Sequence, residues 1–197
     1  MINALLSFID RLIRLTEYRN ARLDKRFDDL FELTFDDLLV IHTDYIEMFE
    51  TTKTLLPKPS EEIGSKRYMR RITRATEYLR KKRRVFEPVR VKIRALAMEA
   101  RDKPSAVEEK QFFNAILNYF PPASLSFGGP STGTTLLQCL AYFSHGDTVR
   151  DAIRFFEDGN GGDIRDLVDQ LLKESREKWS SICEAYAPLK VEAASRK

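Results

Sequence analysis

Hydrophobic residues recur along the first 56 positions at the spacing of an α-helix. At 100° per residue they fall within about 100° of arc, the width of the apolar stripe on an amphipathic helix. The members of this stripe are Ile2, Leu5, Ile9, Leu12, Ile13, Leu23, Phe27, Leu30, Phe31, Leu38, Ile41, Tyr45, Met48, Phe49 and Leu56. Because no glycine or proline precedes Pro57, the pattern predicts one long helix, about 80 Å at ~1.5 Å per residue.

A second interpretation divides this segment into two helices near Thr34. Thr34 can cap the start of a helix, with Asp37 at its third position. However, Thr16 and Thr52 lie on the same stripe, so Thr34 is not distinctive. The single helix is favoured, and the two-helix interpretation stays open.

A turn is expected at residues 57–60, followed by a helix that begins at Glu61 and reaches about Asp102. Its apolar face begins with Tyr68, Ile72, Ala75, Leu79 and Phe86. Pro88 lacks a backbone N–H and is expected to kink this helix or to end its first stretch. Two long helices joined by a short turn predict an antiparallel hairpin over residues 1–103.

Shorter helices are expected over the rest of the chain, and no pair of strands is convincing. The first opens with a capping box at Ser105 and Glu108, and the last begins at Asp163 and reaches about Ala187, with a frayed end. The sequence therefore predicts an all-α protein: a long antiparallel helical hairpin over residues 1–103 and a C-terminal bundle of shorter helices, a compact subdomain over residues 104–197.

Composition agrees with a folded protein of this class. The 197 residues are 43% hydrophobic and 11% aromatic and include only 8 Gly and 8 Pro, which argues against disorder and against a β-sandwich. The two cysteines, Cys139 and Cys183, lie far apart, so a reducing cytoplasm is expected. The sequence contains no run of 18 apolar residues, so no membrane span is predicted. The first residues lack the features of a signal peptide.

Two glycine-rich loops have partial resemblance to ligand-binding motifs. Gly128–Thr135 has phosphate-loop spacing, but Thr134 stands where the lysine belongs. A structural loop is favoured there, with a weak anion site as the alternative. Asp158–Ile164 begins like a calcium loop, but Gly162 and Asp163 break the ligand pattern, so a turn is favoured.

Histidines are too few for most metal and acid–base sites. His42 lies at the edge of the apolar stripe, and His145 precedes a glycine at an expected helix end. Neither belongs to a metal-binding spacing, and no G-x-S-x-G sequence marks a nucleophile. We therefore expect no catalytic residues, metal or cofactor, and identify no small-molecule substrate.

Charge is distributed very unevenly, although the whole chain has a net charge of only +3. Residues 66–103 hold fifteen basic and four acidic residues, a net +11, whereas residues 1–57 have a net charge of −4. On the helix from Lys66, one half of the surface is basic over about 27 Å at ~1.5 Å per residue. We call this half the basic face; it consists of Lys66, Arg67, Arg70, Arg71, Arg74, Lys81, Lys82 and Arg84.

Several partners could meet the basic face. An acidic face of the first helix could lie beside it, in the same chain or in a second subunit; its members are Asp36, Asp37, Asp44, Glu47 and Glu50. A nucleic-acid backbone, solvent or an anionic lipid are the other candidates. Glu77 is the main acid at helical spacing from these cations, and no aromatic side chain lies on the basic face to stack bases.

The first helix is apolar on more than one side, which predicts burial on more than one side. We expect an oligomer or partner interface there, with packing inside the chain as the alternative; its residues are Leu5, Leu6, Phe8, Ile9 and Leu12. The favoured function is a non-enzymatic interaction or scaffold protein that self-associates or binds a protein partner. The alternative is nucleic-acid binding through residues 66–84, and the most remote is an enzyme that uses the loop at 128–135.

Overall fold

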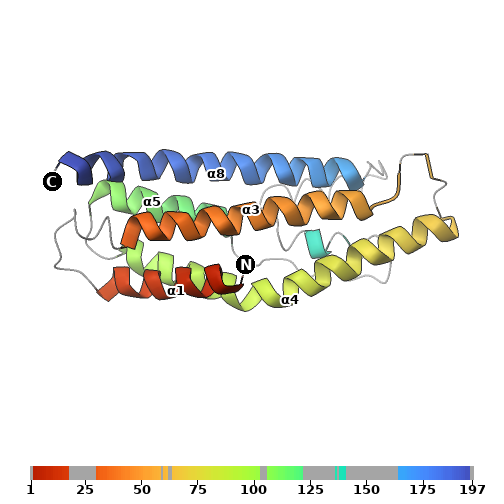
Figure 1. Cartoon of the computed structure of the whole chain (residues 1–197), viewed down its shortest axis with the longest axis horizontal. Coiled ribbons are helices and arrows are strands. Elements are labelled where there is room, and N and C mark those ends of the chain that lie inside the picture. The colour runs from red at the N-terminus through yellow and green to blue at the C-terminus, as the bar shows by residue number, and fades with distance from the viewer. Residues whose placement is uncertain are drawn as a thin grey trace. The chain divides into compact units, whose positions relative to one another are not determined.

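The computed structural model describes a helical protein (Figure 1). The residues described are 2–17, 30–58, 60–61, 64–102, 106–121, 136, 138–140 and 164–195. The helices are α1 (Ile2–Glu17), α3 (Glu32–Leu55), α4 (Lys66–Asp102), α5 (Val107–Tyr119) and α8 (Ile164–Ser195). No strand occurs in these segments, and the predicted all-α class is confirmed.

The prediction of one helix over the first 56 residues is wrong. Arg11 of α1 lies 3.1 Å from a carboxylate oxygen of Asp37 in α3, and it also donates to the carbonyl of Leu33. Twenty-six residues of continuous helix would separate Arg11 and Asp37 by about 39 Å. Two helices lie side by side here instead. Thr34 does not cap the second one, because it is fully buried inside α3.

The apolar stripe is nevertheless the buried side of both helices. Of its described members, Ile13 is half-buried and the others whose side chains are described are buried; these are Leu5, Ile9, Leu12, Leu30, Phe31, Leu38, Ile41, Tyr45, Met48, Phe49 and Leu56. Burial of such side chains is the main favourable contribution to folding. The pattern therefore identified the buried residues correctly while it failed to locate the break between the helices.

The chain forms two compact units, each built from separated segments. Unit 1 comprises residues 1–44, 87–121 and 175–197, and unit 2 comprises residues 45–86 and 122–174. Helices α3, α4 and α8 contribute residues to both units. The expectation that residues 104–197 form a subdomain of their own stays a prediction.

Unit 1 has an aromatic core between α3, α5 and α8. Phe112 of α5 is fully buried and lies with its ring centroid 5.8 Å from that of Phe31 and 6.1 Å from that of Tyr186. The second half of α4 runs antiparallel to α5, and Arg94 donates to the carbonyls of Leu117 and Phe120. These contacts join helices that are distant in sequence.

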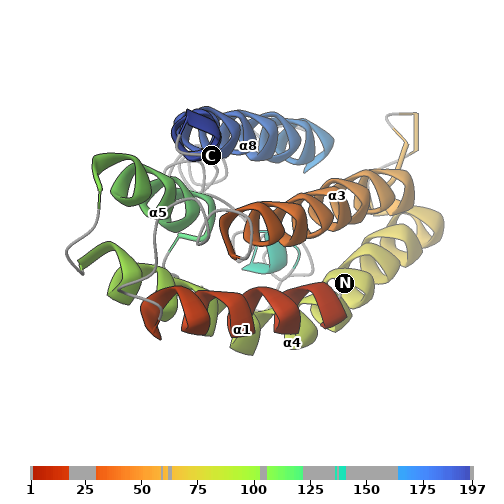
Figure 2. The same cartoon turned by 60° about the vertical axis from the view of Figure 1, so that its left-hand side comes forward.

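Unit 2 contains the second part of α3 and the first part of α4, which run antiparallel as a hairpin in both views (Figures 1 and 2). The ring centroids of Tyr45 and Phe86 lie 5.3 Å apart at one end, and Arg71 donates to the carbonyl of Thr54 at the other. Before α4, Gly64 has a φ of 83°, which is unfavourable for residues with a Cβ. The helix continues through Pro88 as far as Asp102.

The C-terminal helix is longer than predicted. The expected frayed end is instead part of α8, which continues through Pro188 to Ser195. Leu189 and Ala193 are buried at the helical spacing that follows Ile182 and Tyr186, so the last turns are anchored by packing.

The start of α5 also differs from the prediction. Its N-cap residue is Ala106, with no side-chain hydrogen bond, in place of the expected Ser105–Glu108 capping box. Ser105 itself lies outside the described residues.

Candidate functional site

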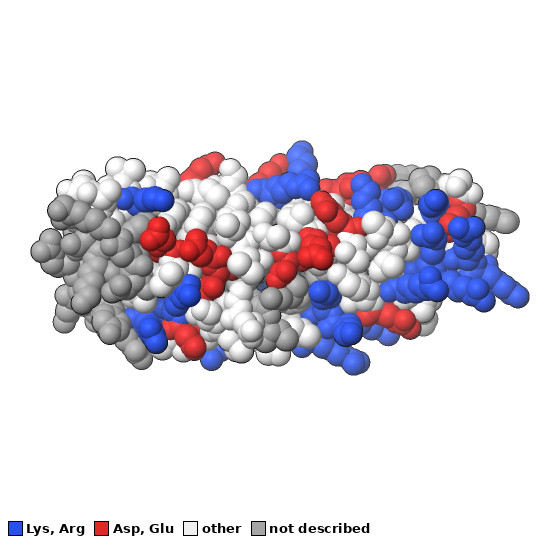
Figure 3. All heavy atoms as spheres, viewed as in Figure 1, with Lys and Arg blue, Asp and Glu red and all other residues white. Residues whose placement is uncertain are grey.

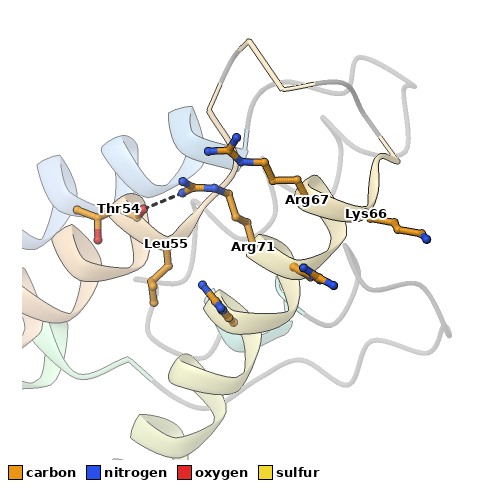
Figure 4. Close-up of a pocket in the computed structure, with 7 residues that line it drawn as sticks. Thr54, Leu55, Lys66, Arg67 and Arg71 are labelled. Carbon is orange, nitrogen blue, oxygen red and sulfur yellow. Dashed lines mark hydrogen bonds between the residues drawn. The ribbon is translucent and has the colours of Figure 1, made fainter.

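A pocket of about 530 Å³ lies where the last turn of α3 faces the first turns of α4 (Figure 4). Thr54 and Leu55 of α3 form one wall, and five cationic side chains of α4 form the other. We call it the arginine pocket; its basic residues are Lys66, Arg67, Arg70, Arg71 and Arg74. All of them belong to the predicted basic face, and the pocket brings them together with a part of α3 that sequence reasoning did not include.

Lysine and arginine side chains gather over the end of α4 where the helix begins (Figure 3). Lys66, Arg70 and Arg74 are exposed, and the side chain of Arg67 is 73% exposed. Such guanidinium groups can donate two parallel hydrogen bonds to a phosphate or carboxylate. This end of the basic face is therefore open to an anionic ligand.

Arg71 differs from its neighbours because it is bound within the fold. It donates to the carbonyls of Thr54 and Leu56, at 3.3 and 3.2 Å, and its side chain is only 24% exposed. The last carbonyls of a helix have no partner within the helix and carry partial negative charge. Arg165 of α8 donates to the carbonyls of Leu56 and Pro57 as well. Arg71 thus has a structural role at the end of α3.

Replacing Arg71 with alanine is expected to lower the free energy of unfolding by about 2 kcal/mol, because the part-buried carbonyl of Leu56 and the exposed carbonyl of Thr54 lose a charged donor. Replacing the adjacent, exposed Arg70 with alanine should change it by less than about 0.5 kcal/mol. Urea titrations followed by circular dichroism measure both values. Equal losses for the two variants would contradict the structural role of Arg71.

Glu61 is the carboxylate in contact with the basic face among the residues that the structure describes. One of its oxygens lies 3.1 Å from Nε of Arg71 and 3.3 Å from Nε of Arg67, and its side chain is 10% exposed. The sequence placed Glu61 in the first turn of the helix, but α4 begins at Lys66, and Ser65 caps it by accepting from the N–H of Tyr68. Glu61 therefore belongs to the connection.

A residue of the predicted acidic face of the N-terminal segment pairs with α1 and not with the basic face. Asp37, one of its members, pairs with Arg11 of α1. Burial raises the pKa of Asp37, an effect that the nearby Arg11 opposes. Part of this acidic surface thus serves contacts inside unit 1.

The remaining residues of the basic face continue along α4. Lys81 and Arg84 are exposed, and the ammonium group of Lys82 lies 5.5 Å from the ring centroid of Tyr78. That distance allows a cation–π contact. Tyr78 therefore lies beside a lysine of the basic face. The sequence pattern had shown no aromatic side chain on that face.

The start of α4 is electrostatically unfavourable as a helix. Its first turn contains no acidic residue, although negative side chains stabilise this end of a helix and positive ones do not. Arg67, Arg70, Arg71 and Arg74 also stand three or four positions apart, a spacing at which like charges destabilise a helix. Local departures of this kind are typical of functional surfaces.

Most of the predicted N-terminal interface is part of the chain's own core. Leu5, Phe8, Ile9 and Leu12 are buried, and Leu6 is 51% exposed. A partner could thus reach Leu6 among these five residues. An oligomer or partner interface on this helix stays a prediction.

His42 is a buried core residue. Its Nδ1 lies 2.9 Å from the hydroxyl of Tyr119, and its ring is stacked on that of Trp179, with centroids 4.8 Å apart. Burial lowers the pKa of His42 to about 4, and the positive charge of Arg176 acts in the same direction. The imidazole is therefore neutral at physiological pH, with a structural role.

The other candidate groups provide no second site in the described part of the chain. Cys139 is a buried free thiol whose pKa is raised by burial, and Cys183 is a half-buried free thiol. Residues 2–17, 30–58, 60–61, 64–102, 106–121 and 164–195, with the few around 136–140, contain no cluster that could hold a metal ion. The loops at 128–135 and 158–163, and His145, lie outside the described residues.

No helix in the described segments combines the length and apolar character needed to cross a membrane. Comparison with protein-family models, with curated proteins and with solved structures gives no match.

Proposed function

We propose that this protein binds nucleic acid, with the basic face of α4 in contact with the phosphate backbone. The observation that carries this proposal is the arginine pocket, which is lined by five cationic residues. Among the described residues, Glu61 is the carboxylate that pairs with them. A surplus of positive charge therefore remains for an anionic partner.

The arrangement of these cations suits a partner with repeated charges. Exposed lysines and arginines extend from the arginine pocket to Arg84 on one side of α4, over about 27 Å at ~1.5 Å per residue. Phosphates that follow one another along a nucleic-acid strand can each meet a cation on such a surface and release condensed counterions. A single carboxylate ligand would use only part of it.

An acidic protein is the less favoured partner because the basic face offers few apolar anchors. Met69 is the one large hydrophobic residue exposed in the stretch 66–84, all of which is described. Protein interfaces obtain most of their affinity from buried aromatic and aliphatic side chains near the centre. The same scarcity of exposed aromatics favours a duplex over a single strand, which binds by stacking its bases.

The test is fluorescence anisotropy with a labelled duplex of ~20 base pairs, titrated with the purified protein between about 50 and about 200 mM salt. Binding should weaken steeply with salt. Changing both Arg70 and Arg74 to alanine should reduce affinity about tenfold and reduce the slope of log K against log salt by about 2. The fold should be unaffected, because both side chains are exposed and have no partner among the described residues.

The matched control removes two positive charges elsewhere. Lys110 and Lys190 are exposed residues of α5 and α8, so the double alanine variant has the same net charge as the test variant. Its affinity should stay within about twofold of the wild-type value. Absence of duplex binding at the lowest salt, or an equal loss in both variants, contradicts the proposal. Binding to acidic vesicles without binding to duplex would assign the basic face to a membrane surface instead.

A further inference from the structure

We propose that the arginine pocket is a binding site for a group of two or more linked phosphates, and that Glu61 is an internal counter-ion with which this ligand competes. The inference rests on the proposed function in part, because the same cations are used. It adds a defined ligand chemistry and a residue that limits affinity.

The dimensions of the pocket suit a compact ligand as well as a passing backbone. Its volume of about 530 Å³ lies within the range of about 300–1,000 Å³ that is usual for small-molecule sites. The wall formed by Thr54 and Leu55 closes one side, as Figure 4 shows. A surface that only follows a long nucleic-acid backbone needs no such wall.

The cations of the pocket divide into two groups by their present contacts. Arg71 has its Nε beside Glu61 and another nitrogen on the carbonyls of Thr54 and Leu56, so it is held by the fold. The side chains of Lys66, Arg70 and Arg74 have no hydrogen bond or ion pair with any residue that the structure describes. They are therefore available as the first ligands of a phosphate group.

Arg67 lies between these groups. Its Nε is 3.3 Å from Glu61, but its side chain is 73% exposed, so it is constrained by this one contact. A linked phosphate pair offers more negative charge and more acceptor oxygens than one carboxylate. Arg67 is thus expected to exchange Glu61 for the ligand, while Arg71 stays at the end of α3.

This exchange makes Glu61 a determinant of affinity. Its carboxylate reduces the positive charge near the pocket and lies beside Nε of Arg67, which could otherwise face the ligand. Removing the charge with the isosteric change Glu61→Gln should therefore strengthen phosphate binding. Because the side chain of Arg67 is 73% exposed, solvent screens its attraction to Glu61, and an increase of about fivefold is expected.

The experiment is isothermal titration calorimetry at low salt with metal-free inorganic pyrophosphate as the probe. Wild-type protein should bind it, the Arg70→Ala, Arg74→Ala variant should bind at least about tenfold more weakly, and Glu61→Gln should bind about fivefold more tightly.

Glu77→Gln is the matched control, because it removes the same charge from an exposed position of α4 outside the pocket. It should change the affinity by less than about twofold. Circular dichroism verifies the fold of each variant, and Glu61→Asp, which keeps the charge on a shorter side chain, should also bind more tightly than wild type.

Two outcomes overturn the inference: no pyrophosphate binding by wild type and Glu61→Gln at millimolar concentration, or affinity in Glu61→Gln that is no higher than in wild type. Duplex binding without pyrophosphate binding would reject this site and leave the proposed function standing. Pyrophosphate binding without duplex binding would support this site and reject the proposed function. Hairpin RNAs of one sequence with a 5′-triphosphate or a 5′-hydroxyl then distinguish a strand end from a free oligophosphate as the source of the ligand.

Discussion

Replacing Phe112 with alanine is expected to lower the free energy of unfolding by about 4 kcal/mol. The ring is fully buried and contacts three other aromatic residues, Phe31, Phe113 and Tyr186. Its removal leaves a cavity that the surrounding helices can only partly fill, and the edge-to-face contact with Phe31 is lost as well. Urea titration followed by circular dichroism at 222 nm measures the loss.

Val107 provides the control within the same helix. It begins α5 and is 65% exposed, so Val107→Ala should change the free energy of unfolding by less than about 0.5 kcal/mol. The contrast separates burial from helix propensity, since alanine favours a helix in both variants. A loss below about 1 kcal/mol for Phe112→Ala would mean that this aromatic core is not packed as described.

The second large effect is a dependence of stability on pH that comes from His42. In the unfolded chain the imidazole has a pKa near 6.5, whereas burial lowers the pKa of the folded residue to about 4. Below pH ~6.5 the unfolded chain therefore binds a proton that the folded chain does not, and the folded state loses stability as the pH falls. The difference between the two pKa values corresponds to a loss of about 3 kcal/mol between pH ~7 and ~4.

The variant His42→Gln isolates this contribution because carboxyl groups also titrate in the acid part of the range. Urea titrations at several pH values, followed by the fluorescence of the single tryptophan, Trp179, give the free energies. The difference between wild type and variant should shift by about 3 kcal/mol toward the variant as the pH falls. A difference that stays constant with pH would show that His42 is protonated as easily in the folded protein as in the unfolded chain.

The buried residues of the first two helices could be predicted from the sequence, but the break between the helices could not. Leu12 and Leu30 lie 18 positions apart, and 18 residues make five turns of α-helix. Two separate helices at this offset share one phase, so a continuous phase says nothing about a continuous helix. The sequence between residues 17 and 30 contains neither glycine nor proline, and the contact of Arg11 with Asp37 is what excludes one continuous helix.

The candidate site was predictable on one side only. Its cations repeat along one helix, so their spacing is visible in the sequence. The opposite wall, Thr54 and Leu55, carries no charge and contributes through its place at the end of α3. Glu61 resembled a first-turn helix residue, and only the start of α4 at Lys66 moves it into the connection. Tertiary contacts, which no local pattern encodes, create these parts of the site.

The two arginines at the end of α3 can make their contacts at different stages of protein synthesis, because their separations from it along the chain differ greatly. Arg71 reaches the carbonyl of Leu56 across 15 positions, whereas Arg165 reaches the same carbonyl across 109. The first contact can form as soon as the beginning of α4 has left the ribosome, but the second requires most of the remaining chain. The end of α3 can therefore be held first within the nascent hairpin and a second time once the beginning of α8 has been made.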